Sequence, residues 1–114
     1  MLSFVALISL GSTACSQGQD ELERASACTS YLYLSAKSDP SSDPHKVVPA
    51  LERARDTARA LSVEQTGSED RRHEIGGRTI REMAERFGTS GGDSPELVAF
   101  LRDQTAECVA RYSG

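Results

Sequence analysis

Residues 47–62, VVPALERARDTARALS, decide the fold class of this chain. Apolar side chains recur there at steps of four and three, at Val47, Leu51, Ala54, Ala58 and Leu61. This spacing places side chains on one face of an α-helix. The other faces are largely charged, so the segment predicts an amphipathic helix with one buried stripe. Pro49 is expected in its first turn, where the missing N–H costs nothing.

Three further segments have the same period, and they cover residues 20–37, 68–87 and 94–112. Prolines and an Asp/Ser cluster in residues 38–44 predict a loop after the first of them. Gly88 suits a left-handed stop for the third helix, and the sequence DSPE at 93–96 is a strong start signal for the fourth. No alternating strand pattern competes. The chain is therefore predicted to be all-α, a small up-down four-helix bundle.

The helix over 68–87 is predicted in more detail than the others. Thr66 and Glu69 have the spacing of a capping box, in which hydroxyl and carboxylate satisfy free backbone N–H groups. The expected buried stripe consists of Gly76, Ile80, Met83 and Phe87. The Gly76-Gly77 pair in mid-helix is a weak point, a kink or a notch for close packing.

The N-terminus has the features of an export signal. Residues 2–10, LSFVALISL, form an apolar run of about nine residues, whereas a membrane-spanning helix needs roughly 20. The run has the length of a signal-peptide hydrophobic region, and residues 12–14, STA, offer a small-x-small cleavage site. The alternative is a buried N-terminal helix of a cytosolic protein.

The segment GSTAC at 11–15 also resembles a bacterial lipobox, in which small residues precede a cysteine that becomes lipidated. Ala14 and Thr13 fit this pattern, whereas Ser12 departs from it because a lipobox prefers leucine there. The resemblance implies a lipid on Cys15. The expected organisation is a signal peptide over 1–14, a tether over 15–19 and a helical domain over 20–114.

The chain has three cysteines, and an odd number in an exported protein needs an explanation. Lipidation of Cys15 would leave Cys28 to pair with Cys108. Cleavage after Ala14 without lipidation would instead leave Cys15 as a free thiol. If the first and last helices are antiparallel neighbours, Cys28 and Cys108 lie at nearly the same level. We therefore expect a disulfide between the first and last helices.

Composition and motifs exclude several classes of function. The formal net charge is −4, and no basic stripe is present to neutralise nucleic-acid phosphates. The chain has no Ser-x-x-Lys and no phosphate-binding loop. The protein is therefore expected not to be an enzyme, to use no cofactor and to bind no nucleic acid.

His73 is the best polar candidate for a ligand site. Glu69 lies four residues before it and would form one edge of a metal or acid/base site. No His-Glu-x-x-His spacing exists, and His45 lies in a proline-rich loop. The favoured interpretation is a solvated helix face with Glu69–His73 and Glu74–Arg78 pairs, so His73 and Glu69 are weak ligand candidates and no metal site is predicted.

Tyr33 and Leu34 lie partly off the apolar stripe of the first helix. Tyrosine is favoured at protein interfaces because it combines apolar area with a hydroxyl. If exposed, the two residues mark a partner surface; the alternative is a helix buried on two sides.

These patterns lead to one functional hypothesis and one alternative. We expect a non-catalytic bacterial envelope lipoprotein that binds another envelope protein, as an accessory or inhibitor module. It would face the periplasm or the outer surface, anchored through Cys15, with the membrane and leaflet left open. The alternative is a periplasmic bundle that binds a small molecule or metal in a cavity near Gly76-Gly77, lined by Ile80, Met83 and Phe87 with His73 at its mouth.

Overall fold

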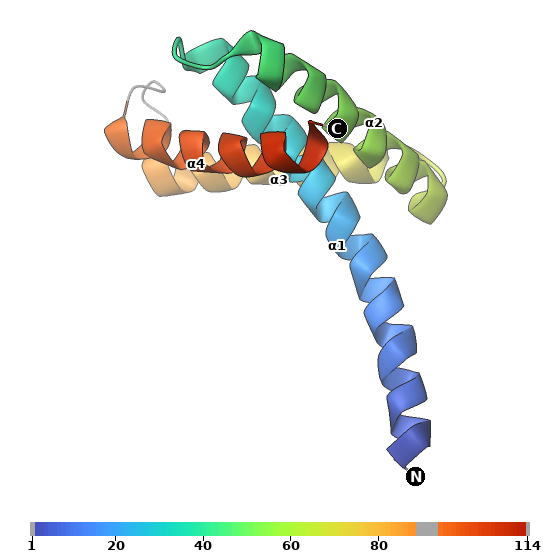
Figure 1. Cartoon of the computed structure of the whole chain (residues 1–114). Helices are drawn as coiled ribbons and strands as arrows, with labels where there is room; N and C mark the ends of the chain where they lie inside the picture. The colour runs from blue at the N-terminus through green and yellow to red at the C-terminus, as the bar shows by residue number, and fades with distance from the viewer. Residues whose placement is uncertain (1, 89–93, 114) are drawn as a thin grey trace.

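The computed structural model describes the backbone of residues 2–88 and 94–113 and the side chains of 18–88 and 94–113 (Figure 1). It contains four α-helices and, within these residues, no strand. The helices are α1 (Leu2–Ser38), α2 (Pro44–Thr66), α3 (Asp70–Phe87) and α4 (Pro95–Tyr112). The predicted all-α four-helix fold is confirmed.

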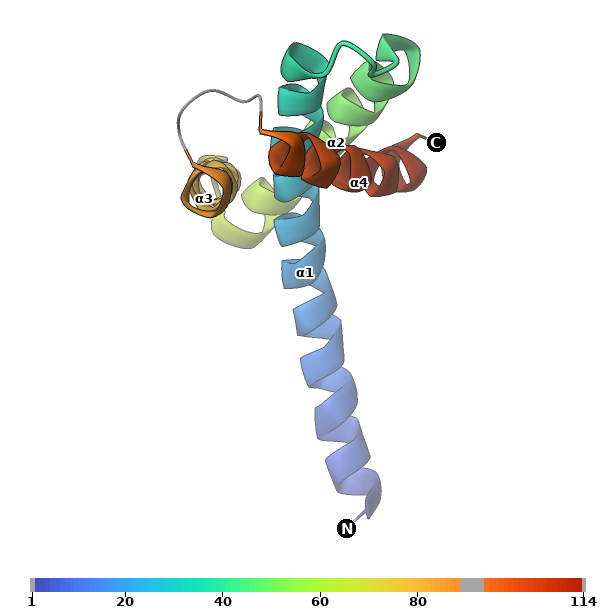
Figure 2. The ribbon, with the colours of Figure 1, turned by 90° about the vertical axis from the view of Figure 1, so that its left-hand side faces the viewer.

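Helix α1 is the centre of the molecule. It contacts each of the other three helices, most extensively α2, whereas α3 and α4 touch each other least. Helices α3 and α4 cross α1, and the two helices overlap in Figure 1 but separate in Figure 2. The α3–α4 contact includes Phe87 and Phe100, whose ring centres are 5.3 Å apart, with the guanidinium of Arg86 over both rings.

The main hydrophobic core is built by three of the four helices. Its buried members are Ala25, Cys28 and Leu32 of α1, Val47, Ala50, Ala54 and Ala58 of α2, and Cys108 and Tyr112 of α4. Small side chains dominate the α2 contribution, which lets α1 and α2 approach closely. Helix α3 supplies no member of this cluster, so its attachment to the bundle has another basis.

The predicted disulfide between the first and last helices is present. Cys28 and Cys108 are bonded, with their Cα atoms 5.6 Å apart. Side-chain contacts follow one another in antiparallel order along the two helices, at Glu21–Tyr112, Cys28–Cys108 and Asp39–Arg102. The predicted pairing is therefore confirmed, and the contacts run in opposite directions along the two helices, although α4 crosses α1 obliquely (Figures 1 and 2).

Helix α2 begins three residues before its predicted start. The side chain of Asp43 accepts a hydrogen bond from the N–H of His45, and Pro44 occupies the first helical position. This cap and proline form a helix start signal within the segment that was predicted to be a loop. Pro49 consequently lies inside the helix and not in its first turn. At the other end Gly67, in the left-handed conformation, stops α2.

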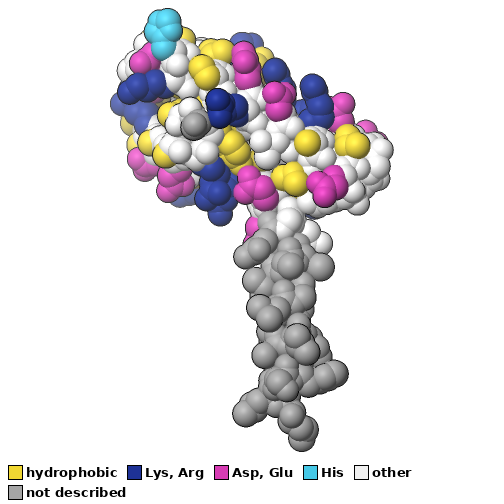
Figure 3. Space-filling view, turned by 45° about the vertical axis from the view of Figure 1, so that its right-hand side comes forward, with side chains coloured by type: hydrophobic (Ala, Val, Ile, Leu, Met, Phe, Trp, Pro, Cys, Tyr) yellow, Lys and Arg dark blue, Asp and Glu magenta, His cyan; other side chains and the backbone are white. Residues whose placement is uncertain are grey.

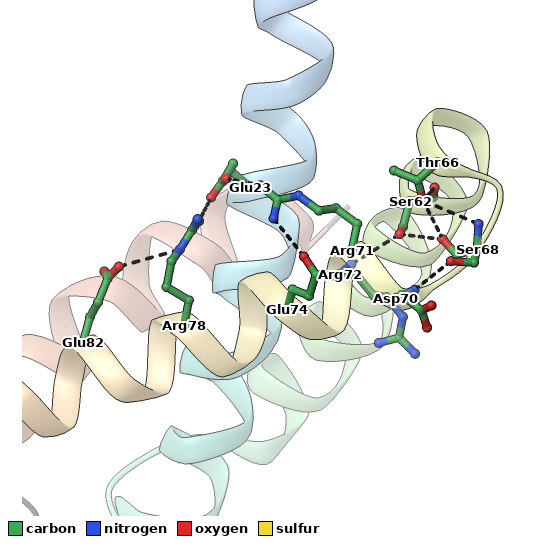
Figure 4. Close-up of polar contacts among 10 residues, drawn as sticks. All are labelled: Glu23, Ser62, Thr66, Ser68, Asp70, Arg71, Arg72, Glu74, Arg78 and Glu82. Carbon is green, nitrogen blue, oxygen red and sulfur yellow. Dashed lines mark hydrogen bonds and ion pairs between the residues drawn. The ribbon is translucent and has the colours of Figure 1, made fainter.

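The capping box predicted for α3 does not form. Thr66 is the last residue of α2, and its hydroxyl donates to the carbonyl of Ser62 at 2.8 Å. Glu69 occupies the cap position without a side-chain capping bond. The Ser62 hydroxyl joins the two helices instead, because it donates to the Ser68 carbonyl at 2.7 Å and accepts from the N–H of Arg72 (Figure 4).

The predicted buried face of α3 is also wrong. Ile75, Thr79 and Met83 are buried, whereas Ile80 is 46% exposed. The true stripe lies one residue earlier than predicted at its first two positions and coincides at the third, so the buried face is turned by less than the roughly 100° that one residue spans in an α-helix. Met83 belongs to both patterns and is the one fully buried residue of the predicted set.

Ion pairs fasten α3 to α1. The carboxylate of Glu23 lies between the guanidinium groups of Arg71 and Arg78, with the Arg71 contact at 3.5 Å (Figure 4). Arg71 also pairs with Glu74, and Arg78 with Glu82, so each arginine bridges two carboxylates. The α1–α3 contact is thus more polar than the α1–α2 contact.

The backbone of α1 is helical from Leu2 onward and projects beyond the other helices (Figure 1). The helix therefore includes residues 15–19, for which the sequence predicts a tether, and that segment contains no proline to interrupt it. Signal-peptide cleavage is a processing step that the fold does not test. The boundary at residue 14 stays a prediction.

Candidate functional site

Tyr33 lies on the outer side of α1. Its side chain is 46% exposed, whereas the neighbouring Leu34 is half-buried. The ammonium of Lys37 lies 5.2 Å from the centre of the Tyr33 ring, within the range of a cation–π interaction. Of the predicted partner surface, Tyr33 is therefore available for contact and Leu34 only in part.

Tyr31, two residues earlier, behaves differently. Its ring packs edge-on against Phe100 of α4, with the ring centres 5.6 Å apart. Burial raises the pKa of the Tyr31 hydroxyl, and the nearby carboxylate of Glu82 adds to this effect. Tyr31 joins α1 to α4, so Tyr33 is the tyrosine of this segment that faces outward.

Among the described residues, three other large apolar side chains are exposed to an extent close to that of Tyr33, although the sequence did not predict their exposure. They are Val48, Val63 and Ile80. On the face drawn in Figure 3, hydrophobic side chains form small separate groups among mixed positive and negative charges. Val48 and Val63 could have been found because they lie off the predicted stripe of their helix; Ile80 could not, because the sequence placed it in the core.

His73 and Glu69 are not brought together as a pair. Glu69 accepts from Arg72 at 2.7 Å and from Arg59 at 3.0 Å, and the hydrogen bond from Arg72 is the main cause of its lowered pKa. His73 is exposed. The predicted Glu74–Arg78 pair is likewise replaced, since each residue pairs with the partners described above. Within residues 18–88 and 94–113 no group of three or more metal-ligating side chains is present.

A shallow depression of about 230 Å³ lies beside the Gly76-Gly77 pair. Its lining includes His73, Ile80 and the hydroxyl-bearing residues Ser26, Thr29 and Ser30 of α1. The Ser26 hydroxyl is buried and has no hydrogen-bond partner among the described residues. The predicted lining of the cavity is wrong at two positions. Met83 is buried and Phe87 packs on Phe100, so neither lines the depression.

The glycine pair is a packing notch. The Ser30 hydroxyl donates to the carbonyl of Gly76 at 3.3 Å. A Cβ added at Gly76 would lie 3.3 Å from that hydroxyl, whereas a Cβ added at Gly77 would meet open space. The absence of a side chain at Gly76 therefore allows α1 and α3 to approach closely, whereas the absence of one at Gly77 does not contribute.

The two bonded cysteines are almost completely buried, at 5% exposure for Cys28 and 2% for Cys108. Burial among core side chains suits a structural bond. The backbone of Cys15 belongs to α1, and its side chain lies outside the described residues. Among the described residues, no helix has both the length and the apolar character needed to cross a bilayer.

Comparison with known proteins adds no relative. The chain matches no protein-family model, and no curated protein or solved structure is significantly similar to it.

Proposed function

We propose that this chain is a non-catalytic envelope lipoprotein that is anchored through Cys15 and binds another envelope protein. The lipobox-like segment and the odd number of cysteines support the anchor. The exposed Tyr33 ring supports the binding role and is the observation that carries it. Since tyrosine is enriched in interface hot spots, we place the partner surface around Tyr33, with Leu34 at its edge.

The arrangement of polar groups supports a non-catalytic role. General acid–base or nucleophilic catalysis needs a titratable group within hydrogen-bond reach of a second reactive group. In the described part of the chain, hydroxyl–carboxylate hydrogen bonds occur at Ser41–Asp39 and Tyr112–Glu21, but an arginine of α4 also pairs with each carboxylate. No serine or cysteine side chain among these residues bonds to a histidine ring. Near His73, the carboxylate of Glu69 is engaged by Arg59 of α2 and by Arg72 of α3.

In-cell crosslinking followed by affinity purification and mass spectrometry tests the binding role. We expect one stoichiometric envelope partner, lost on Tyr33→Ala. The matched control is Val63→Ala, which removes an equally exposed apolar side chain from α2. Recovery of the protein alone, or equal loss in both variants, would contradict the proposal.

The anchor has its own test. Intact-mass spectrometry of the mature protein should give a chain that begins at Cys15 and carries added acyl mass. A chain that begins at Cys15 without that mass would exclude the lipid anchor and leave a free thiol.

A second candidate is a periplasmic binder of a small molecule or metal. The depression beside Gly76-Gly77 favours it, because the buried Ser26 hydroxyl there lacks a partner and His73 lies on the rim. Native mass spectrometry of the protein purified without denaturant would reveal a retained ligand. For a metal, addition of Zn²⁺ should raise the Tm of the wild type and not that of His73→Ala; an unchanged Tm would exclude Zn²⁺ binding at His73.

A further inference from the structure

The end of the bundle from which α1 emerges is formed by all four helices. Gln65 of α2 donates from Nε2 to the carbonyl of Gly18 at 2.9 Å. Tyr112 of α4 donates from its hydroxyl to Glu21 at 2.9 Å, and burial together with that carboxylate raises the pKa of the tyrosine.

Two arginines complete these contacts around α1. Arg111 of α4 lies 3.7 Å from Glu21, and Arg71 of α3 lies 3.5 Å from Glu23. We call the four residues that surround α1 at this level, Gln65, Arg71, Arg111 and Tyr112, the collar. Each of the other three helices contributes to it, so the collar meets α1 on several sides.

The collar is close to Cys15 along the chain. Gly18, the first α1 residue that it touches, is three residues after Cys15, which is about 4.5 Å along a helix axis. The helix is continuous through both positions. At most one helical turn of chain therefore separates the bundle from an anchor at Cys15.

We propose that in the anchored protein the collar faces the bilayer surface and the α1–α2 turn, residues 39–43, points away from it. This inference rests on the proposed lipid anchor at Cys15. Acyl chains hold Cys15 at the membrane, and the three-residue connection to Gly18 keeps the collar close to it. Because the collar surrounds α1, tilting the helix presses one of its members into the headgroups.

Arg71 and Arg111 of the collar are 41% and 46% exposed at the side chain, so both can reach lipid phosphates. Each also pairs with a carboxylate of α1, so the orientation rests on the short connection to Cys15 and not on a net positive charge. The orientation also sets the height of the proposed partner surface. Tyr33 is 18 residues after Cys15, which is about 27 Å along the helix, so the partner must present its contact at that distance from the bilayer.

Two label positions on α2 test the orientation. Glu64→Cys places a nitroxide beside the collar, and Val48→Cys places one about 24 Å away along the same helix, since 16 residues separate them. Both side chains are exposed. The disulfide occupies Cys28 and Cys108 and acylation occupies the Cys15 thiol, so the introduced thiol is the one that reacts.

The acylated protein is incorporated into vesicles of phosphatidylethanolamine and phosphatidylglycerol that contain a Ni²⁺-chelating lipid. Relaxation of the nitroxide by Ni²⁺ should be several-fold stronger at position 64 than at position 48. Vesicles without Ni²⁺ give the baseline for each label.

The outcomes separate this inference from the proposed anchor. Equal relaxation at the two positions in a protein whose acyl mass is verified would overturn the orientation alone. Stronger relaxation at position 48 would reverse it. An acyl-free mature chain would overturn the anchor and this inference together.

Discussion

Helix α1 contacts α2 and α4 mainly through apolar side chains, whereas its contact with α3 is largely polar. Against α2 and α4 it buries apolar side chains in one cluster and carries the disulfide. Against α3 it relies on Glu23 between two arginines and on the hydrogen bond from Ser30 to Gly76. The buried residues Ile75, Thr79 and Met83 add a small second apolar contact.

This difference indicates where the stability of the molecule lies. Apolar burial contributes about 25 cal/mol per Å² and is not screened by salt. Half-exposed ion pairs contribute about 0–1 kcal/mol each and are screened by salt. We therefore regard α1, α2 and α4 as the stable unit and α3 as the more weakly attached helix, and the predictions below test that division.

The disulfide should have the largest effect. Replacing both cysteines, Cys28→Ser with Cys108→Ser, opens a loop whose ends are 80 residues apart. Loop-closure entropy predicts a loss of about 4–5 kcal/mol as an upper estimate, comparable to the whole stability of a small domain. Urea unfolding of oxidised wild type, reduced wild type and variant measures it. An unchanged unfolding midpoint in the variant would show that the three-helix core does not need the bond.

The next largest effect is the difference between truncating a buried and an exposed isoleucine of α3. Ile75→Ala removes a side chain that is 1% exposed, and truncation of a buried isoleucine costs about 2–5 kcal/mol. Ile80→Ala removes the same atoms from a half-exposed position and should cost far less. Urea unfolding of the two variants is the measurement. Equal losses would mean that α3 is rotated from the orientation described here.

Ile75 and Ile80 also show why the orientation of α3 could not be predicted from the sequence, whereas the start of α4 could. Residues 75, 79 and 83 repeat at helical spacing, and so do 76, 80, 83 and 87, so periodicity alone leaves two orientations open. The first orientation buries Thr79, and an apolar pattern in the sequence does not predict that a threonine is buried. The start of α4 was predictable because Ser94 and Pro95 act locally: the Ser94 hydroxyl accepts from the N–H of Leu97.

Tertiary competition limited the other predictions. Thr66 could be the last residue of α2 or a capping residue of α3, and in the structure it is the last residue of α2. Of the candidate site, the off-stripe position of Tyr33 was evident from spacing. The engagement of Glu69 by Arg59 depends on how α2 and α3 meet, which no local pattern encodes.

The glycine pair gives a smaller and signed test. Gly77→Ala should stabilise the protein by up to about 1 kcal/mol, because alanine is the better helix former and the added methyl meets open space. Gly76→Ala should gain less or destabilise, because its methyl would crowd the Ser30 hydroxyl. Thermal unfolding of both variants measures the difference. A larger gain at Gly76 would exclude a close approach of α1 and α3 at that residue.

The smallest expected effect concerns an ion pair of the stable unit, between Asp39 and Arg102, because the arginine side chain is 57% exposed and solvent screens the pair. Hydrogen bonds from Arg102 and Ser41 lower the pKa of Asp39 from 3.8 to about 2. A carboxyl whose pKa falls on folding stabilises the folded state above its unfolded pKa, and this contribution disappears as the pH drops from about 4 to 2. Asp39→Asn should therefore lower the urea midpoint at pH 7 and change it less at pH 2, whereas Asp103→Asn on the exposed face of α4 should show no such trend. If Asp39→Asn at pH 7 costs as much as removal of the disulfide, ion pairs hold the disulfide-linked unit as strongly as its covalent bond does, and the division between the two regions fails.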